Sequence, residues 1–259
     1  MTDRRSIPDP TLSRENTPAA IARPVVDLRR SAGGARDRQL LMGDKVAVLG
    51  RGAGYAHVRV EKDGYHGFVL QDVLGPSSEA THRISAASSH AYTQADIKSP
   101  DLLALSFGSR VSALRESSDF IETELGYIPK QHVRPADSTE RDPVEVARLF
   151  LETPYLWGGN SRWGIDCSGL VQAAFLACGI ACPGDSDQQQ EHFGAPLPDG
   201  TPRKAGDLLF WHGHVALVLD GRSLIHANAH HMATRIEDMQ AAMARIEKQG
   251  LLLLAHVRP

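Results

Sequence analysis

Two stretches of the chain that lie 65 positions apart share one pattern, and few folds can accommodate it. Residues 40–49 and 105–114 each hold a short apolar run interrupted by a glycine, and an alternating segment with a Gly-Tyr pair follows in both copies. Short alternating runs separated by glycine turns are typical of small antiparallel β barrels. Because the pattern occurs twice, it predicts two such barrels, at residues 23–78 and 79–136.

The segment before the first barrel, residues 1–22, is rich in Arg, Asp, Pro and Ser and shows no hydrophobic period. This composition predicts a flexible arm or a strap over the surface. The segment also lacks the apolar stretch of a secretory signal peptide. The chain has three cysteines, an odd number that forms no complete disulfide framework. A chain without a signal and without such a framework is expected in the cytoplasm.

Charge and hydropathy bear on the partners that this chain can take. The 28 Lys and Arg nearly balance the 31 Asp and Glu, and the formal net charge is −3. No block of basic residues interleaved with aromatic residues marks a nucleic-acid groove, so no nucleic-acid partner is expected. The longest apolar run, residues 251–255, is too short to cross a bilayer and predicts a buried strand. No membrane partner is expected either.

A change of hydrophobic period after the polar linker at residues 136–140 indicates a domain of another kind. Asp142-Pro143-Val144-Glu145 is a helix start, and the helix is predicted to run to about Glu152. A second helix is predicted to begin near Cys167 and to end at Gly179. The later runs predict strands, at residues 207–211, 215–219, 223–227 and 251–257. Residues 141–259 are therefore predicted to form an α+β domain.

The second of these helices places a cysteine where it can act as a nucleophile. At a helix amino terminus the exposed amides and the helix dipole stabilise a thiolate, so we expect a lowered pKa for Cys167. Peptide cleavage also needs a general base and a third group that holds the tautomer of that base. His214 is the candidate base and His226 the candidate orienting group.

The register of one predicted hairpin decides whether the two histidines meet. A two-residue turn at Asp220-Gly221 would turn their side chains to opposite faces. A three-residue loop that ends in a left-handed Gly221 would instead pair Val218 with Arg222 and would put both histidines on one face. We predict the three-residue loop with its bulge.

Other interpretations of these residues stay open. Cys167 could be a buried helix cysteine that packs as a small apolar group. His212, His230 and His231 are rival bases, with His230 and His231 expected at the surface or rim. Cys178 and Cys182 lie near histidines, but their spacing matches no strong zinc pattern, and burial is the expected role of both. No metal site is predicted.

Four motifs in this part of the chain carry a specific resemblance. They are Tyr-Leu-Trp-Gly-Gly at 155–159, Asp-Cys-Ser-Gly-Leu-Val at 166–171, Gly-Asp-Leu-Leu-Phe-Trp at 206–211 and His-Val-Ala-Leu-Val at 214–218. Through them residues 141–259 resemble an NlpC/P60 domain, and residues 23–135 resemble two bacterial SH3 domains. The resemblance implies an α+β fold, with a papain-like catalytic domain behind two small SH3-like barrels. It also implies a Cys-His-His triad without metal or organic cofactor, and cleavage of the γ-D-glutamyl to diamino-acid bond of murein stem peptides.

The same resemblance implies roles for residues around the triad. Tyr155 would help bind the oxyanion and Trp157 would wall the pocket. The paired SH3 modules, the missing signal and the segment from Asp185 resemble the branch that recycles free stem peptides with an unblocked L-alanine. In that branch the amine pocket would be closed by Asp166, Ser168, Asp185 and Ser186, together with Asp44 and Tyr92 of the SH3 region. A buried ammonium needs such carboxylate and hydroxyl partners.

Two other functions and two structural interpretations remain. The chain could be an exported endopeptidase that acts on intact peptidoglycan, or a non-catalytic protein that binds muropeptides. Asp44 and Tyr92 could be structural residues of a turn and a loop. Asp185 could simply cap a helix through residues 188–191.

Overall fold

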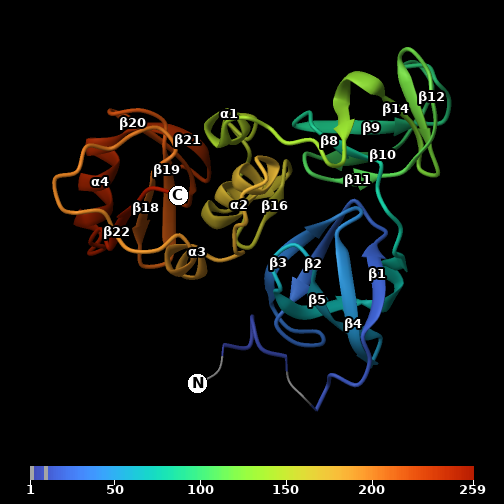
Figure 1. Ribbon diagram of the computed structural model, residues 1–259, viewed down its shortest axis with the longest axis horizontal. Helices are drawn as coiled ribbons and strands as arrows, with labels where there is room; N and C mark the ends of the chain where they lie inside the picture. The colour runs from blue at the N-terminus through green and yellow to red at the C-terminus, as the bar shows by residue number, and fades with distance from the viewer. Residues whose placement is uncertain (1–2, 9–10) are drawn as a thin grey trace. The chain divides into compact units, whose positions relative to one another are not determined.

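The computed structural model describes residues 3–8 and 11–259, which divide into two compact units at Ser138. The first unit consists of strands, and the second combines helices with a sheet (Figure 1). Within the described residues, no helix has the length and apolar character that a membrane span requires.

The first barrel is built on one antiparallel sheet with the strand order β3-β2-β6-β5-β4-β1-β7. Its elements are β1 (Thr17–Ile21), β2 (Val25–Arg29), β3 (Arg36–Leu41), β4 (Lys45–Gly52), β5 (Tyr55–Val60), β6 (His66–Leu70), η1 (Gln71–Val73) and β7 (Leu74–Pro76). Alternate residues of these strands point inward, and Leu28, Leu40, Val48 and Val58 are fully buried in one core. This alternation is the period of two that the sequence shows.

The predicted flexible arm is wrong over residues 17–21. This segment is strand β1, which pairs with β4 on one side and with β7 on the other, and it buries Ala19 and Ile21. A five-residue strand with two alanines and a proline has little strand propensity of its own, and its pairing partners override that propensity. Nearer the start, Arg4 forms an ion pair with Asp37. Residues 1, 2, 9 and 10 of the predicted arm lie outside the described residues.

The rest of the first unit folds into two smaller sheets, with the orders β10-β9-β14-β13-β12 and β11-β8-β15. Their elements are β8 (His82–Ile84), β9 (Ser88–Tyr92), β10 (Asp101–Ser106), β11 (Arg110–Val111), β12 (Ala113–Glu116), β13 (Phe120–Thr123), β14 (Gly126–Pro129), η2 (Lys130–His132) and β15 (Val133–Pro135). Gly43 and Gly108 stand at matching positions of the sequence repeat, and both are left-handed, with φ of 79° and 86°. Because both turns need a positive φ, the repeat is a repeat of backbone geometry.

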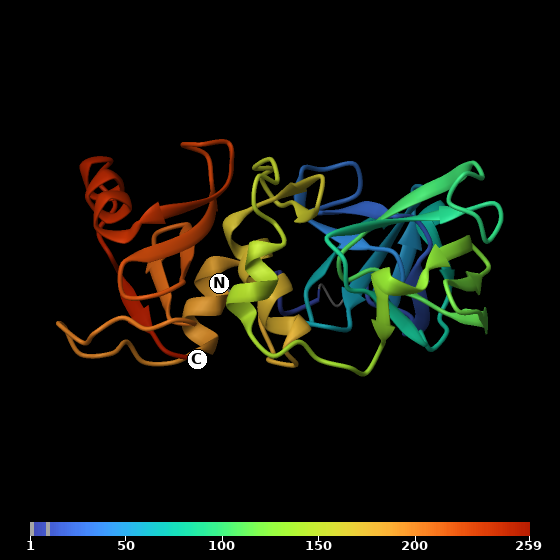
Figure 2. The same ribbon diagram turned by 90° about the horizontal axis from the view of Figure 1, so that it is seen from above.

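The second unit has a five-stranded antiparallel sheet in the order β21-β20-β19-β18-β22. Its elements are α1 (Pro143–Arg148), β16 (Asn160–Ser161), β17 (Gly164–Ile165), α2 (Cys167–Ala177), α3 (Ser186–His192), β18 (Leu208–Trp211), β19 (His214–Val218), β20 (Ser223–Asn228), β21 (Ala233–Asp238), α4 (Met239–Lys248) and β22 (Ala255–Val257). Figures 1 and 2 show α2 and α4 on opposite sides of this sheet. Ala216, Val218 and Leu224 pack with α4, while α2 contacts β19 and β20.

Helices α1 and α2 begin directly after aspartates that cap them, Asp142 and Asp166. The Asp142 carboxylate accepts a hydrogen bond from Val144 N, and the Asp166 carboxylate accepts one from Gly169 N. Helix α1 ends at Arg148, four residues before the predicted end, and turns lead to the left-handed Glu152. Helix α2 ends at Ala177, Cys178 is its C-cap, and the left-handed Gly179 follows.

The predicted hairpin register between β19 and β20 is wrong. Val218 pairs with Leu224 instead of Arg222, and Gly221 is not left-handed. The Asp220 side chain accepts hydrogen bonds from the amides of Arg222 and Ser223, so a side chain stabilises this turn and a left-handed glycine is not needed. The error is two residues, and a shift of two keeps every side chain on its face of the sheet.

Three further elements differ from the predictions. The apolar run at residues 251–254 lies outside a strand, with Leu252 66% exposed and Leu254 52% exposed, and β22 begins only at Ala255. Strand β21 and helix α4 occupy residues for which the sequence predicts neither element. Asp238 caps α4 by accepting a hydrogen bond from Ala241 N.

Candidate active site

The start of α2 fixes the position of Cys167. One oxygen of the Asp166 carboxylate accepts from Gly169 N at 2.7 Å, and the other accepts from Gly158 N at 2.8 Å. A Cβ atom at Gly169 would lie 2.4 Å from the carbonyl oxygen of Gly159. The absence of a side chain at Gly169 therefore lets the 155–159 loop pack directly against the helix that carries the cysteine.

The predicted pKa shift of Cys167 is wrong in direction. The residue is only 6% exposed, and burial, followed by the neighbouring Asp166 carboxylate, raises the pKa of the thiol to about 12. Backbone amides of Val215 and Ser168 favour the thiolate but do not outweigh the lost hydration. The sulfur accordingly donates a long hydrogen bond to Gly213 O at 4.0 Å. The free protein holds Cys167 as a thiol.

The two predicted histidines form a direct pair. His214 Nε2 lies 2.8 Å from His226 Nδ1, and the ring centroids are 5.0 Å apart. Burial, followed by the neighbouring His226 and Arg245, lowers the pKa of His214 to about 3, so this imidazole is neutral near pH 7. Because Gly213 contacts the cysteine sulfur and directly precedes His214, the nucleophile and the pair belong to one site.

Tyr155 joins this site from the loop before α2. Burial, the neighbouring Cys167 and Asp166 raise the pKa of the phenol, so its hydroxyl is neutral and able to donate a hydrogen bond. Tyr155 also lines a cavity of about 370 Å³. The other lining side chains that bear on the chemistry are His212, His214, His226, Asn228, His230 and Arg245. Of the rival bases, His212 is exposed, and His230 packs edge-on against His231.

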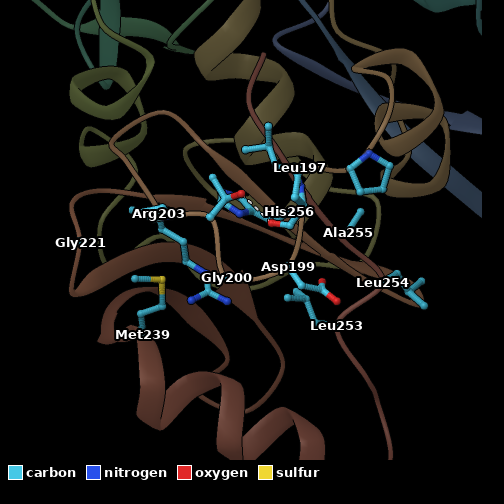
Figure 3. Close-up of a pocket in the computed structure, with 14 residues that line it drawn as sticks. Leu197, Asp199, Gly200, Arg203, Gly221, Met239, Leu253, Leu254, Ala255 and His256 are labelled. Atoms are coloured by element: carbon cyan, nitrogen blue, oxygen red, sulfur yellow. Dashed lines mark hydrogen bonds between the residues drawn. The ribbon is translucent and has the colours of Figure 1, made fainter.

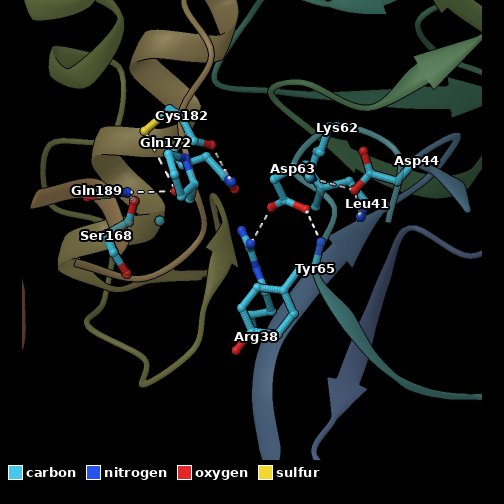
Figure 4. A network of polar contacts seen from close by, with 12 residues as sticks. Arg38, Leu41, Asp44, Lys62, Asp63, Tyr65, Ser168, Gln172, Cys182 and Gln189 are labelled. Atoms are coloured by element: carbon cyan, nitrogen blue, oxygen red, sulfur yellow. Dashed lines mark hydrogen bonds and ion pairs between the residues drawn. The ribbon is translucent and has the colours of Figure 1, made fainter. Parts of the chain in front are cut away.

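The other predicted substrate residues of this unit lie on α2, on α3 and in the loop. Ser168 is buried and donates to the Asp166 carboxylate at 3.1 Å, and its carbonyl accepts from Gln189 Nε2 of α3 (Figure 4). Asp185 stands at the cap position of α3, but its side chain makes no capping hydrogen bond, so the capping interpretation is wrong. Ser186 is the first residue of α3. Trp157 is 67% exposed, and its role as a pocket wall stays a prediction.

Asp44 and Tyr92 belong to the first unit. Asp44 is buried beside the Gly43 turn, where its carboxylate accepts from Leu41 N at 2.9 Å and pairs with Lys62 Nζ at 2.7 Å (Figure 4). Tyr92 ends β9 and packs edge-on against Phe120. These contacts give both residues structural roles, and their roles toward a substrate remain predictions.

Glu237, which no sequence motif indicated, contacts His226 of the histidine pair. Its Oε1 lies 2.6 Å from His226 Nε2 and 2.5 Å from Arg245 Nη2, and its Oε2 lies 3.3 Å from His231 Nε2. Glu237 comes from β21 and Arg245 from α4, the two elements that the sequence did not predict. The alternation of Thr-Arg-Ile-Glu places Glu237 on one face of a strand, but nothing in it points to a partner on β20.

A second cavity in this unit is lined by residues other than those of the candidate active site. It measures about 400 Å³ and shares no lining residue with the cavity at His214 (Figure 3). His256 on its wall contacts the buried Asp207 at 2.6 Å, and Arg258 pairs with the same carboxylate. Cys182 is also buried, and its carbonyl accepts from Gln172 Nε2. His256, Asp207 and Arg258 form one set of contacts within the domain and Cys182 and Gln172 form another, and both sets have a structural role.

Comparisons with known proteins agree with this architecture. The NlpC/P60 family matches residues 152–248, and the bacterial dipeptidyl-peptidase SH3 domain matches residues 28–74. A crystal structure of an NlpC/P60 family protein from Bacillus cereus ATCC 10987 has a TM-score of 0.75 and 19% identity, and the match covers 93% of this chain and 99% of that chain. The predicted fold class, an NlpC/P60 domain behind an SH3-like domain, is thereby confirmed.

Two curated relatives have related names. A dipeptidyl-peptidase 6 from Lysinibacillus sphaericus is 37% identical over 115 residues, which are 40% of this chain and 41% of that protein. A gamma-D-glutamyl-L-lysine dipeptidyl-peptidase from Bacillus cereus (strain ATCC 10987 / NRS 248) is 24% identical over 225 residues, which are 74% of this chain and 67% of that protein. The match to the first thus spans less than half of that relative's length.

Proposed function

Since this chain belongs to the NlpC/P60 peptidase family and carries a bacterial dipeptidyl-peptidase SH3 domain, we propose that it is a cysteine peptidase of murein stem peptides. Its substrate is a stem peptide with a free amino-terminal L-alanine, and it hydrolyses the bond between the γ-carboxyl of D-glutamate and the diamino acid. The observation that carries the proposal is the 2.8 Å contact between His214 and His226 beside the buried Cys167.

In the first half of the reaction the enzyme is acylated. The free enzyme holds a thiol and a neutral imidazole, so His214 takes the proton of Cys167 as the sulfur attacks the γ-carbonyl carbon. The Cys167 amide and the Tyr155 hydroxyl donate to the developing oxyanion. The carbon to nitrogen bond then breaks, and His214 passes its proton to the amine of the departing diamino acid.

The second half releases the dipeptide. Water attacks the thioester carbonyl while His214 accepts one of its protons, and that proton returns to the sulfur as the carbon to sulfur bond breaks. The products are L-Ala-D-Glu and the diamino acid or the peptide that it begins. All groups in this scheme are side chains or amides of the chain.

Selectivity for the free amine is the finer part of the proposal. Asp166, Ser168, Asp185 and Ser186 would offer the ammonium their carboxylates and hydroxyls. An acylated alanine would leave those groups without partners, which costs binding energy. A cytoplasmic place in peptide recycling follows from this selectivity.

The names of the relatives favour L-lysine as one diamino acid. The decisive experiment compares free L-Ala-γ-D-Glu-L-Lys, its diaminopimelate analogue and the N-acetylated forms, with products weighed by mass spectrometry and Cys167→Ala as the control. We expect L-Ala-D-Glu from the free peptides, and cleavage of the acetylated forms slower by at least about 100-fold. Faster digestion of acetylated peptides or of intact sacculi would replace the proposal by an exported endopeptidase. Binding without cleavage would replace it by a muropeptide-binding protein.

A further inference from the structure

Glu237 collects three nitrogen donors from different parts of the catalytic unit. His226 reaches it from β20, His231 from the turn between β20 and β21, and Arg245 from α4, at distances of 2.6, 3.3 and 2.5 Å. Only 16% of the Glu237 side chain is exposed, and the His226 side chain is fully buried. The carboxylate therefore contacts His226 at Nε2, the ring nitrogen that does not contact His214.

The charge of this carboxylate is fixed by its partners. Burial alone would raise the pKa of Glu237, but hydrogen bonds from His226, Arg245 and His231 hold it well below its usual range. Glu237 is thus ionised at every pH at which the enzyme would work. An ionised carboxylate only accepts hydrogen bonds, so the 2.6 Å contact requires a hydrogen on His226 Nε2.

The hydrogen on His226 Nε2 also determines which nitrogen of His214 carries a hydrogen. Burial lowers the pKa of His226, so near pH 7 its ring is neutral, and with a hydrogen on Nε2 its Nδ1 is an acceptor. Nδ1 lies 2.8 Å from His214 Nε2, which must then carry the hydrogen of that contact. His214 is neutral as well, so the lone pair of its ring is on Nδ1.

We propose that Glu237 is a positioning residue of the active site, which fixes both histidines as Nε2-H tautomers and so makes His214 Nδ1 the atom that accepts the cysteine proton. Arg245 keeps the carboxylate ionised and directed at His226. The mechanistic part rests on the proposed function, whereas the tautomer assignment stands by itself. Without the carboxylate, both rings can reverse their hydrogen bond, with His226 Nδ1-H donating to His214 Nε2. His214 Nδ1 would then carry a hydrogen and could accept no proton.

The tautomers can be measured directly by nitrogen NMR on protein with ¹⁵N-labelled histidine, in which protonated and unprotonated ring nitrogens have well-separated shifts. The wild-type protein at pH 7 is expected to show Nε2-H on both His214 and His226, assigned by loss of signals in His214→Gln and His226→Gln. A hydrogen on His214 Nδ1 in the wild type would overturn the proposal, and this test requires no variant of Glu237 to fold.

Two substitutions of Glu237 distinguish the effect of its hydrogen-bond acceptor from the effect of its side-chain volume. Glu237→Ala removes the acceptor, and His214 is expected to shift toward the Nδ1-H form, with kcat lower by about 10- to 100-fold and KM within about 3-fold. Glu237→Gln keeps an oxygen for His226, and its amide can donate to His231. This variant is expected to keep the wild-type tautomers and to recover kcat to within about 10-fold. Glu247→Ala removes an exposed carboxylate from the same helix as Arg245 and is the matched control, with kinetics unchanged.

The outcomes separate this inference from the proposed function. A wild-type protein that cleaves no stem peptide would end the proposed function, while the ring nitrogen shifts would still decide the tautomers. A Glu237→Ala protein with wild-type kcat, or with His214 still in the Nε2-H form, would overturn the role of Glu237 and leave the peptidase intact. Equal losses of kcat in the Ala and Gln variants, with unchanged tautomers in both, would reduce Glu237 to a structural residue.

Discussion

His214 and His226 meet at 2.8 Å although the strand register does not place them opposite each other. The pairing of Val218 with Leu224, continued along the hairpin, sets Ala216 across from His226. The contact is therefore a diagonal one on a single face of the sheet, within reach of long or planar side chains. Such a contact leaves room beside His214 for the Asn228 side chain, which lines the same cavity.

The reactivity of Cys167 should follow the raised pKa of its thiol. With a pKa of about 12, the thiolate fraction grows throughout the working range. The rate of alkylation by iodoacetamide is therefore expected to rise about tenfold per pH unit from pH 6 to pH 9, without a plateau. The measurement uses a Cys178→Ser, Cys182→Ser background, so that only one thiol reacts. A plateau below pH 7 would mean that the free enzyme holds an ion pair.

Gly169 and Gly221 form a matched pair for testing the packing of the nucleophile loop. A Cβ at Gly169 would lie 2.4 Å from Gly159 O, so Gly169→Ala forces the 155–159 loop away from α2. We expect a loss of about 1–3 kcal/mol in the free energy of unfolding, together with a lower kcat. At Gly221 nothing lies within 4 Å and φ is not left-handed, so Gly221→Ala should be neutral or slightly stabilising. Denaturant titration measures both, and equal losses would contradict the packing argument.

The first unit should lose stability in acid through His66. This residue is buried, and burial, followed by His57 and Arg59, lowers its pKa to about 4. The unfolded chain binds a proton near pH 6.5 and the folded one only near pH 4, so stability is full above pH 6.5 and declines as the pH falls toward 4. His66→Phe is expected to reduce this decline by about 1–3 kcal/mol.

The control for His66 is His90→Asn, which changes an exposed histidine of the same unit. Its unfolding free energy should follow the wild-type pH dependence between pH 7 and pH 4. An unchanged acid decline in His66→Phe would show that other groups take up the protons.

Removing one partner of the buried ion pair of Arg38 and Asp63 should lower the free energy of unfolding strongly. Replacing both partners by apolar residues should lower it much less. Arg38 Nη1 and Asp63 Oδ2 are 2.5 Å apart, the side chains are 2% and 1% exposed, and Arg38 also lies over the Tyr65 ring (Figure 4). Arg38→Ala removes the guanidinium that neutralises a buried carboxylate and is expected to lower the free energy of unfolding by about 3–5 kcal/mol. The double variant Arg38→Met, Asp63→Leu should lose less than the sum of its single changes.

The exposed pair of Arg115 and Glu122 is the comparison for that ion pair. Its atoms lie 4.0 Å apart, and the arginine side chain is 85% exposed. Arg115→Ala should change the unfolding free energy by less than about 1 kcal/mol. If Arg38→Ala and Arg115→Ala lowered the free energy of unfolding by similar amounts, burial would not determine how much an ion pair contributes.

Sequence patterns predicted the parts of the fold in which local chemistry and long-range structure agree. Asp142 and Asp166 cap helices where a capping residue precedes an apolar period, and Gly43 and Gly108 turn where the repeat demands it. Strand β1 was missed because its five residues acquire strand character only between β4 and β7. Helix α4 was missed because it follows a strand whose own period is weak.

The residues of the candidate site also differ in whether the sequence could identify them. Cys167, His214 and Tyr155 could be named because each lies in a short motif, and His226 because a predicted hairpin brings it to His214. Glu237 stands in no such motif, and its importance comes from the rings and the guanidinium that converge on it from three other segments. The pKa of Cys167 was predicted wrongly because a helix start is visible in sequence, whereas the depth at which the sulfur lies is not.

The place of β1 in the first barrel has a consequence for synthesis on the ribosome. This strand emerges before the rest of the barrel, yet Thr17 pairs with Val48 and Ile21 pairs with Leu74. Its pairing with β7 must therefore wait until translation has passed Pro76, and closing so long a loop slows folding. During that interval one edge of β1 stays open to neighbouring nascent chains, so the order in which these strands are synthesised affects the risk that the first barrel aggregates.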